Sequence, residues 1–310
     1  MPFALDAEVA AAIAGLLPAD ATPPPPAPRG DWQARRAGVT AMMAGIKSGQ
    51  PEHGDVERVD HHVGVPARWY APPGGGRGSA VVYLHGGGMI GSSVDLYDRT
   101  IAGYVADSGV PMLAVDYRLA PEHPHPTPVE DCYAGLAWLT AHAADLNVDP
   151  ARIAVMGDSA GGGLAAGTVL LARDRGLPVA RQILVYPMLD DRTTKDDPAL
   201  ASLAGWSADD NFTSWHALLG DAVGGPDVSP YAAPARARDL SGLPPSYVEV
   251  GELDIFRDES IDYARRIAAA GGSVELHVHP GCPHGFELIA PDSAVARRAR
   301  ADRLRVLTDF

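Results

Sequence analysis

The chain has 310 residues, 46% of them hydrophobic, and a formal net charge of −14 at pH 7. This length and composition allow a substantial buried core, and we expect one catalytic domain with an elaboration. The scattered acidic charge argues against nucleic acid or an anionic membrane as a partner. Two cysteines, Cys132 and Cys282, are too few for a disulfide framework.

The first predicted element is a helix near the N-terminus. The stretch "MPFALDAEVAAAIAGLLPADA" could be a signal peptide, but no Lys or Arg precedes its apolar run, and Asp6 and Glu8 interrupt it. Apolar residues recur there at helical spacing, at Leu5, Val9, Ile13 and Leu16. A packed amphipathic helix is therefore favoured. No stretch approaches the ~20 apolar residues of a membrane span, so we expect a cytoplasmic protein without stable membrane association.

The next segments change from helix to strands. "TPPPPAP" (22–28) predicts a stiff spacer before a second helix over 32–46. Two runs, 55–63 and 65–70, are joined through Gly64 and predict an antiparallel strand pair.

From Ala80 onward, short apolar runs alternate with helical patterns. The runs are "AVVYLH", "PMLAVDY", "RIAVM", "QILVYP", "SYVEVGE" and "SVELHVH". The predicted helices cover 96–108, 128–145, 160–175, 255–270 and 292–308. Continuous apolar runs are typical of strands covered on both faces. The alternation predicts an α/β fold with a mostly parallel sheet between helices.

One segment departs from this alternation. Between "YPMLDD" and "SYVEV" there is no sheet-strand pattern, although aromatic residues occur at Trp206, Phe212 and Trp215. We interpret this segment as a helical insertion that serves as a lid.

The sequence "GDSAG" (157–161) predicts a nucleophile. A serine hydroxyl becomes reactive when a sharp turn exposes it beside a base, and G-x-S-x-G between a strand and a helix forms such a turn. Ser159 has this context, with the run 152–156 before it and a helical pattern after it. A glycine-rich turn without chemistry is the alternative that this motif alone leaves open.

A second glycine cluster follows the strand "AVVYLH". Three consecutive glycines at a strand end can present bare backbone N–H groups to a substrate. We expect the N–H groups of Gly86, Gly87 and Ala160 to surround a carbonyl oxygen as it becomes negative, which forms an oxyanion hole.

A base and an orienting acid are expected after later strands. Asp254 follows "SYVEVGEL" and His284 follows "SVELHVHPGCP", so both should lie at the strand ends that face Ser159. Asp258 and Glu252 remain alternative acids. His277, His279, Cys282 and His284 could instead bind a metal, but no Cys-pair or acid-rich motif accompanies them, and we expect neither metal nor cofactor.

Taken together, these motifs resemble the bacterial hormone-sensitive-lipase-like carboxylesterases of the α/β-hydrolase superfamily. The resemblance spans 83–287 and rests on "HGGG", "DYRLAPEHP", "GDSAGGG", "ELDIFRDE" and "PHGFE". It implies a catalytic triad of Ser159, Asp254 and His284 and the same oxyanion donors. Arg118 and Glu122 in "DYRLAPEHP" are expected to brace the loops around that hole.

The resemblance also implies a helical cap and a pocket. The cap would comprise 1–46 and 191–235, and the α/β-hydrolase domain 47–190 and 236–310. The expected pocket residues are Met89, Trp206, Phe212, Trp215, Ile255 and Phe256. Met89, Ile255 and Phe256 stand where relatives often carry other residues, so they bear on substrate preference. A homodimer through the edge strand and the last helix is a further expectation from the family.

The predicted activity is hydrolysis of short- to medium-chain acyl esters through an acyl-enzyme. An amidase, lactonase or acyltransferase would use the same residues. Plant gibberellin receptors resemble this family and bind a small molecule without turnover, but they depart at the triad histidine, which is present here as His284.

Overall fold

The computed structural model of the protein describes residues 3–16, 26–195 and 197–310. Its sheet has eight strands in the order β1-β2-β4-β3-β5-β6-β7-β8. The strands are β1 Glu57–His62, β2 Pro66–Ala71, β3 Ala80–Leu84, β4 Met112–Val115, β5 Ile153–Asp158, β6 Arg181–Val185, β7 Ser246–Gly251 and β8 Val274–His279. β2 pairs antiparallel with β1 and β4, and all other pairs are parallel. The predicted α/β fold is confirmed.

The strand order reverses beside β3. From β3 the chain crosses to β4 on one side and then to β5 on the other, so the loops that follow β3 and β5 diverge. A crevice forms at such a switch point, outside the carboxyl ends of the strands. The glycine cluster follows β3 and Ser159 follows β5, which brings both motifs to this crevice.

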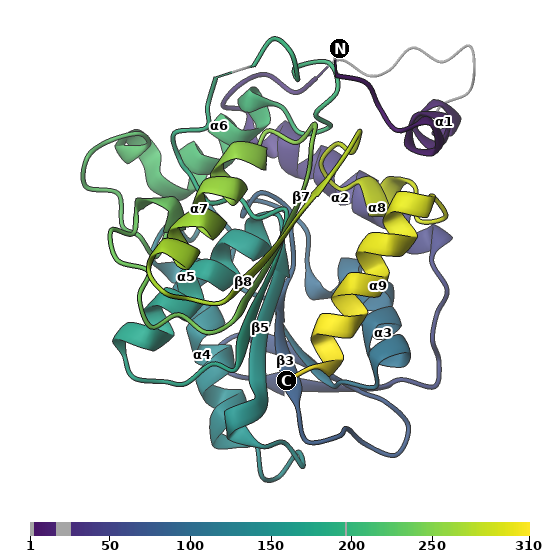
Figure 1. Ribbon diagram of the computed structural model, residues 1–310, viewed down its shortest axis with the longest axis vertical. Helices are drawn as coiled ribbons and strands as arrows, with labels where there is room; N and C mark the ends of the chain where they lie inside the picture. Colours follow the sequence, from purple (N-terminus) through teal and green to yellow (C-terminus); the bar gives the residue numbers. More distant parts are fainter. Residues whose placement is uncertain (1–2, 17–25, 196) are drawn as a thin grey trace.

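Helices cover both faces of the sheet. The helices of the described residues are α1 Ala7–Gly15, α2 Trp32–Gly49, α3 Val94–Ser108, α4 Thr127–Ala141, α5 Ala160–Asp174, α6 Ala208–Leu219, α7 Arg257–Ala269, α8 Phe286–Ile289 and α9 Ala294–Thr308. α4, α5 and α7 lie on one face, and α3 and α9 lie side by side on the other (Figure 1). α2 contacts α6, the helix of the predicted insertion.

Burial explains the strand patterns. Every residue of β3, β4, β5 and β7 is buried, as their continuous apolar runs predicted. β1 and β8 form the sheet edges and mix exposed with partly covered positions. Charged side chains on such edges discourage pairing with other chains. On β8, however, Leu276 and Val278 are each 37% exposed.

The N-terminal segment packs through three of the four apolar residues that its helical spacing singled out. Val9 of α1 is fully buried in a small apolar cluster with Phe286 and Cys282, and Leu5 and Ile13 pack against it. Leu16 is exposed. Most of the predicted proline-rich spacer lies outside the described residues. Among the described helices, none has the length and apolarity needed to cross a bilayer.

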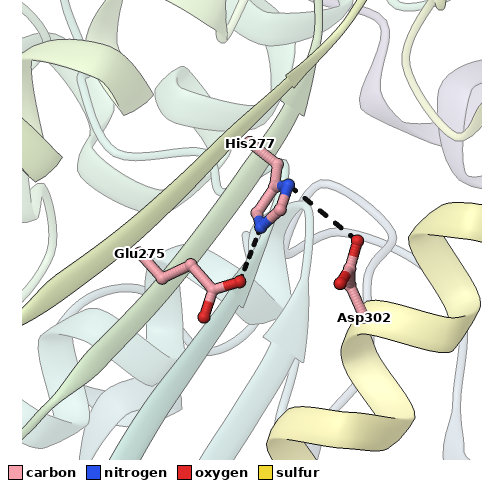
Figure 2. A group of neighbouring side chains, drawn as sticks. All are labelled: Glu275, His277 and Asp302. Atoms are coloured by element: carbon pink, nitrogen blue, oxygen red, sulfur yellow. Dashed lines mark hydrogen bonds and ion pairs between the residues drawn. The ribbon is translucent and has the colours of Figure 1, made fainter.

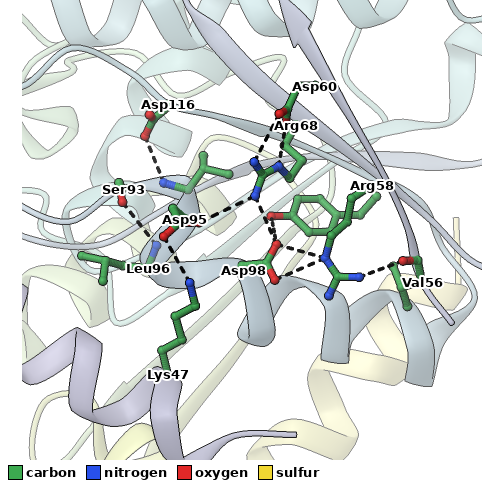
Figure 3. Close-up of polar contacts among 12 residues, drawn as sticks. Lys47, Val56, Arg58, Asp60, Arg68, Ser93, Asp95, Leu96, Asp98 and Asp116 are labelled. Carbon is green, nitrogen blue, oxygen red and sulfur yellow. Dashed lines mark hydrogen bonds and ion pairs between the residues drawn. The ribbon is translucent and has the colours of Figure 1, made fainter. Parts of the chain in front are cut away.

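An ion network joins the β1–β2 pair to α3 (Figure 3). The Asp98 carboxylate accepts hydrogen bonds from Arg58 Nε at 3.1 Å and Tyr70 OH at 3.0 Å, and Arg68 Nη1 lies 3.4 Å away. Burial alone would raise the pKa of Asp98, but these donors hold it below its ordinary value of 3.8. The ionised carboxylate therefore stabilises the fold.

We expect Asp98→Ala to lower the free energy of unfolding by about 3 kcal/mol, because it leaves two arginines without their shared partner. Asp95→Ala is the matched control on the same helix, since Asp95 is 72% exposed, and it should cost less than about 1 kcal/mol. The contribution of Asp98 is present above pH 3.8 and is lost as the pH falls through its lowered pKa. Urea unfolding at pH 7 measures both variants, and equal losses would contradict the prediction.

Candidate active site

Ser159 lies on a sharp turn between β5 and α5. Its φ of +56° is a left-handed value that a non-glycine residue adopts only at a cost. Two glycines make the turn feasible, because a Cβ on Gly157 would lie 2.2 Å from Gly161 O and one on Gly161 would lie 2.0 Å from Leu84 O. The glycines of "GDSAG" thus allow the backbone approach that presents the hydroxyl at the end of β5.

The structure places the predicted base and acid beside this serine. His284 Nε2 lies 2.8 Å from Ser159 Oγ, and His284 Nδ1 lies 2.6 Å from Asp254 Oδ2. Asp254 is fully buried, and its other oxygen accepts the N–H of Phe256 at 2.9 Å. That turn delays helix α7 until Arg257, two residues after the predicted start.

The surroundings of His284 favour its charged form. Burial lowers the pKa of the imidazole, but the carboxylates around it, first Asp254 and then Glu287 and Asp158, outweigh burial and raise the net pKa above 6.5. The rings of Tyr186 and Phe256 meet the imidazole edge-on, with centroids 4.7 and 5.1 Å away. These contacts orient the ring, and the arrangement can take a proton from the serine and hold the resulting cation.

The three glycines of the loop after β3 lie differently with respect to the cavity. Gly87 and Gly88 line the cavity that contains Ser159, whereas Gly86 does not. Gly86 instead faces the protein interior, because a Cβ on it would lie 2.6 Å from Asp158 Oδ2 and 2.8 Å from Tyr97 OH. Positive φ angles of +124° at Gly87 and +65° at Gly88 turn the loop, a detail that three identical residues cannot reveal in sequence.

A buried carboxylate supports this loop from below. Asp158 Oδ1 accepts Tyr83 OH at 2.8 Å, and Oδ2 accepts Tyr97 OH at 2.6 Å. Burial raises the pKa of Asp158 to about 6, although both phenols lower it. The residue between Gly157 and Ser159 thereby ties the serine turn to β3 and α3, the elements on either side of the glycine loop.

Helix α2 braces the same loop from outside. Arg36 Nη2 donates to Ala120 O at 2.8 Å, its Nε donates to Ile90 O, and the guanidinium pairs with Glu122 at 2.6 Å. Glu122 therefore acts through Arg36. Arg118 Nη2 instead lies 2.7 Å from Asp131 Oδ1 of α4.

The hydroxyl of Ser159 faces a cavity of about 300 Å³. Of the six predicted pocket residues, Trp206 lines this cavity. Met89, Trp215 and Phe256 are fully buried and belong to the hydrophobic core instead of lining the cavity. Ile255 packs against the same core, and Phe212 lies under the Arg29 guanidinium at 3.8 Å.

Most of the apolar lining of the cavity was not predicted from the sequence. α2 contributes Val39, Met42, Met43 and Ile46, and α8 contributes Leu288 and Ile289. The α2 residues recur at helical spacing, which was the available signal. Nothing in the local pattern distinguishes an apolar helix face that lines a cavity from one that packs on a core.

Polar contacts hold the insertion to α2 and to His284. Arg35 forms an ion pair with Asp210 of α6, and Gly30 N–H donates to Thr213 Oγ1 at 2.8 Å. Ala204 O accepts the backbone N–H of His284 at 3.0 Å. The insertion thus covers the cavity and also contacts the histidine loop.

The residues of the alternative metal set have separate partners. His277 Nε2 lies 2.7 Å from Glu275, and its Nδ1 lies 3.9 Å from Asp302 (Figure 2). Arg305 also pairs with both carboxylates, so a cation is already present there. His279 faces Glu249 at 3.6 Å, and Cys282 Sγ faces Pro280 O. These groups do not converge with His284.

The two alternative acids also have other partners. Asp258 pairs with Arg257 at 2.7 Å and is 80% exposed. Glu252 Oε2 accepts the N–H of Gly281 at 2.9 Å. Among the three acids, Asp254 is the one that the structure places against His284.

Comparisons with known proteins found a family, curated relatives and solved structures that are similar to this chain. A family model described as alpha/beta hydrolase fold matches residues 81–288. The chain is 40% identical over 252 residues to Carboxylesterase NlhH of Mycobacterium tuberculosis, covering 75% of each chain. It is 34% identical to the Ethyl acetate hydrolase of Pseudomonas putida, covering 72% of this chain and 71% of that one. The structure of Bacterial Heroin Esterase has a TM-score of 0.87 at 39% identity, covering 98% of this chain and 97% of that chain.

Proposed function

The chain belongs to the α/β-hydrolase family, and from that membership we propose that it is a serine carboxylesterase in which Ser159, His284 and Asp254 form the catalytic triad. The observation that carries the proposal is the continuous hydrogen-bonded series from Ser159 Oγ through His284 to Asp254. This series lies at a cavity large enough for a small ester.

The proposed reaction has two halves. His284 Nε2 takes the proton of Ser159 as Oγ attacks the ester carbonyl, and Asp254 stabilises the imidazolium. The alcohol leaves with that proton, and water then hydrolyses the acyl-enzyme by the same transfers. Every proton transfer uses the chain's own residues, so the mechanism requires neither metal nor organic cofactor.

We assign the oxyanion hole to the N–H groups of Gly87, Gly88 and Ala160. Gly87 and Gly88 line the cavity, and Ala160 is the first residue of α5, where the N–H is free of intrahelical bonding. The partial positive charge at that helix end adds to the stabilisation of the oxyanion. We leave Gly86 out of the proposed oxyanion hole, because it packs against Asp158 and Tyr97 in the interior.

We propose short- to medium-chain acyl esters as substrates. The cavity of about 300 Å³ is at the lower end of the range for ligand pockets, and its apolar walls suit an acyl chain. The cap proposed over it comprises 1–46 and 191–235, with the catalytic domain formed by 47–190 and 236–310. The contacts of α2 with α6 support treating both parts as one cover.

The proposal extends to location and assembly. Both cysteines are buried and unpaired, which suits a reducing compartment such as the cytoplasm. The exposed apolar residues of β8, Leu276 and Val278, support a homodimer through this edge and α9.

The test is hydrolysis of an ester panel with graded acyl and alcohol sizes by the purified protein, together with fluorophosphonate labelling. We expect turnover of short and medium acyl esters and a label on the peptide that contains Ser159. An amide substrate in the same panel separates esterase from amidase activity. Turnover without modification of Ser159 would overturn the assignment.

A further inference from the structure

Three cavities with lining residues in common lie between the surroundings of Ser159 and the face where α3 meets α9. The first is the active-site cavity. The second measures only about 10 Å³ and shares Tyr97, Asp158, Tyr186 and Leu288 with the first. The third measures about 280 Å³, opens toward solvent, and shares Thr100, Tyr104, Glu287, Leu288 and Arg303 with the second. Each cavity therefore shares wall residues with the next one.

The middle cavity is polar. Its walls include the carboxylates of Asp158 and Glu287 and the phenols of Tyr97, Tyr104 and Tyr186. Glu287 Oε1 accepts Tyr186 OH at 2.6 Å and Arg303 Nη1 at 2.8 Å. Its other oxygen, Oε2, is buried without a hydrogen-bond partner among the described residues.

A water molecule would satisfy this oxygen. Buried polar atoms nearly always have a hydrogen-bond partner. A volume of about 10 Å³ is at the lower limit for one water, and the surrounding phenols and carboxylates supply the two or more further partners that a buried water needs. An ester group has no room there.

We propose that these cavities form a second route into the active site, which supplies water to the acyl-enzyme from the α3–α9 face while substrate enters beneath the cap. The proposal rests on the serine esterase function proposed above. In the acyl-enzyme, the acyl group occupies the apolar cavity and obstructs the path under α2 and α6. Water arriving past Tyr186 reaches the side of His284 that this ring contacts.

The chemical step is the second half of the reaction. The water oxygen bonds to the acyl carbon while His284 Nε2 accepts one of its protons. The bond from Ser159 Oγ to that carbon then breaks, Oγ recovers the proton, and a carboxylic acid is released. The route therefore affects deacylation and leaves acylation unchanged.

Gly103 offers a way to block the route without touching the active site. It lines the outer cavity from α3, and a Cβ there would lie 3.3 Å from the flexible ends of Arg300 and His53. Gly103→Leu fills this space. Ala106→Leu adds a leucine at an exposed position of the same helix and serves as the matched control.

The experiment measures how the acyl-enzyme partitions between water and 1-butanol when a p-nitrophenyl ester is the substrate. We expect Gly103→Leu to lower the ratio of acid to butyl ester at least threefold, with the p-nitrophenol burst rate within twofold of the unsubstituted protein. Ala106→Leu should change neither. An unchanged ratio in folded Gly103→Leu would overturn the second route, whereas absence of any acyl-enzyme on Ser159 would overturn the proposed function itself.

A second variant covers the case in which Gly103→Leu fails to fold. Gly103→Cys adds a small side chain, and alkyl methanethiosulfonates of increasing size then fill the cavity after folding, while Cys132 and Cys282 are buried. The acid-to-ester ratio should fall stepwise with reagent size. A ratio independent of size, or a crystal structure in which no water contacts Glu287 Oε2, would overturn the proposal.

Discussion

Ser159→Ala and His284→Ala should each lower kcat for ester hydrolysis by about 10⁵–10⁶-fold. The serine hydroxyl supplies the attacking atom, and the imidazole 2.8 Å away accepts its proton, so removal of either group disables the same step. Steady-state assays with an activated ester, at enzyme concentrations high enough to follow slow turnover, measure the loss. Circular dichroism and thermal unfolding check that each variant keeps the fold.

The double variant sharpens this prediction. Groups that act as a unit are not additive, so Ser159→Ala combined with His284→Ala should be no slower than either single variant. His279→Ala is the control, because the His279 side chain is 9% exposed against 13% for His284, and it faces Glu249 instead of the serine. A further large drop in the double variant, or an equal loss in His279→Ala, would contradict a shared catalytic role.

Much of the fold was predictable because each strand carries its own signal. The buried strands β3, β4, β5 and β7 are continuous apolar runs, and Gly64 marks the turn between the antiparallel β1 and β2. Helix ends were less predictable, since they depend on single contacts. The start of α7 is set by the Asp254 carboxylate accepting the N–H of Phe256, a bond that no periodicity indicates.

The residues of the site also differ in how well the sequence predicts them. Ser159, Asp254 and His284 could be chosen from sequence because each follows a strand whose carboxyl end must face one crevice. The choice between Gly86 and Gly88 could not, since it depends on the φ angles of adjacent identical residues. The pocket was least predictable, because Trp215 and Phe256 look like lining residues in sequence but pack in the core.

The contacts also explain why distant segments meet at the reacting atoms. Arg36 of α2 holds the loop after β3 through Ile90 O and the loop after β4 through Ala120 O, and Asp158 binds Tyr97 of α3, the helix that follows the glycine loop. Ala204 of the insertion accepts the N–H of His284. The segments proposed as the cap are therefore tied to both the glycine loop and the histidine loop, so changes at their contacts should alter rates as well as substrate access.

Asp254→Asn should lower kcat by about 10⁴-fold at neutral pH. The carboxylate accepts His284 Nδ1–H at 2.6 Å, which leaves Nε2 free to accept the serine proton. An asparagine amide can donate to Nδ1 and so hold the opposite tautomer, with the proton on Nε2. Asp258→Asn and Glu252→Gln, which change the two other acids near this turn, should keep most of the activity.

The pH profile of activity distinguishes the loss of the Asp254 charge from a mere displacement of the His284 ring. In the unsubstituted protein Asp254 raises the pKa of His284 above 6.5, so activity should fall as the pH drops through that raised value, where the base becomes protonated. Asp254→Asn removes the largest influence that raises the pKa of the imidazole, whereas burial still lowers it and the weaker influences of Glu287 and Asp158 remain, so the residual activity should persist to lower pH. Measurement of kcat/KM from pH 5 to 9 tests both variants. An acid limb that stays in place, or that moves to higher pH in Asp254→Asn, would show that this carboxylate does not set the ionisation of His284.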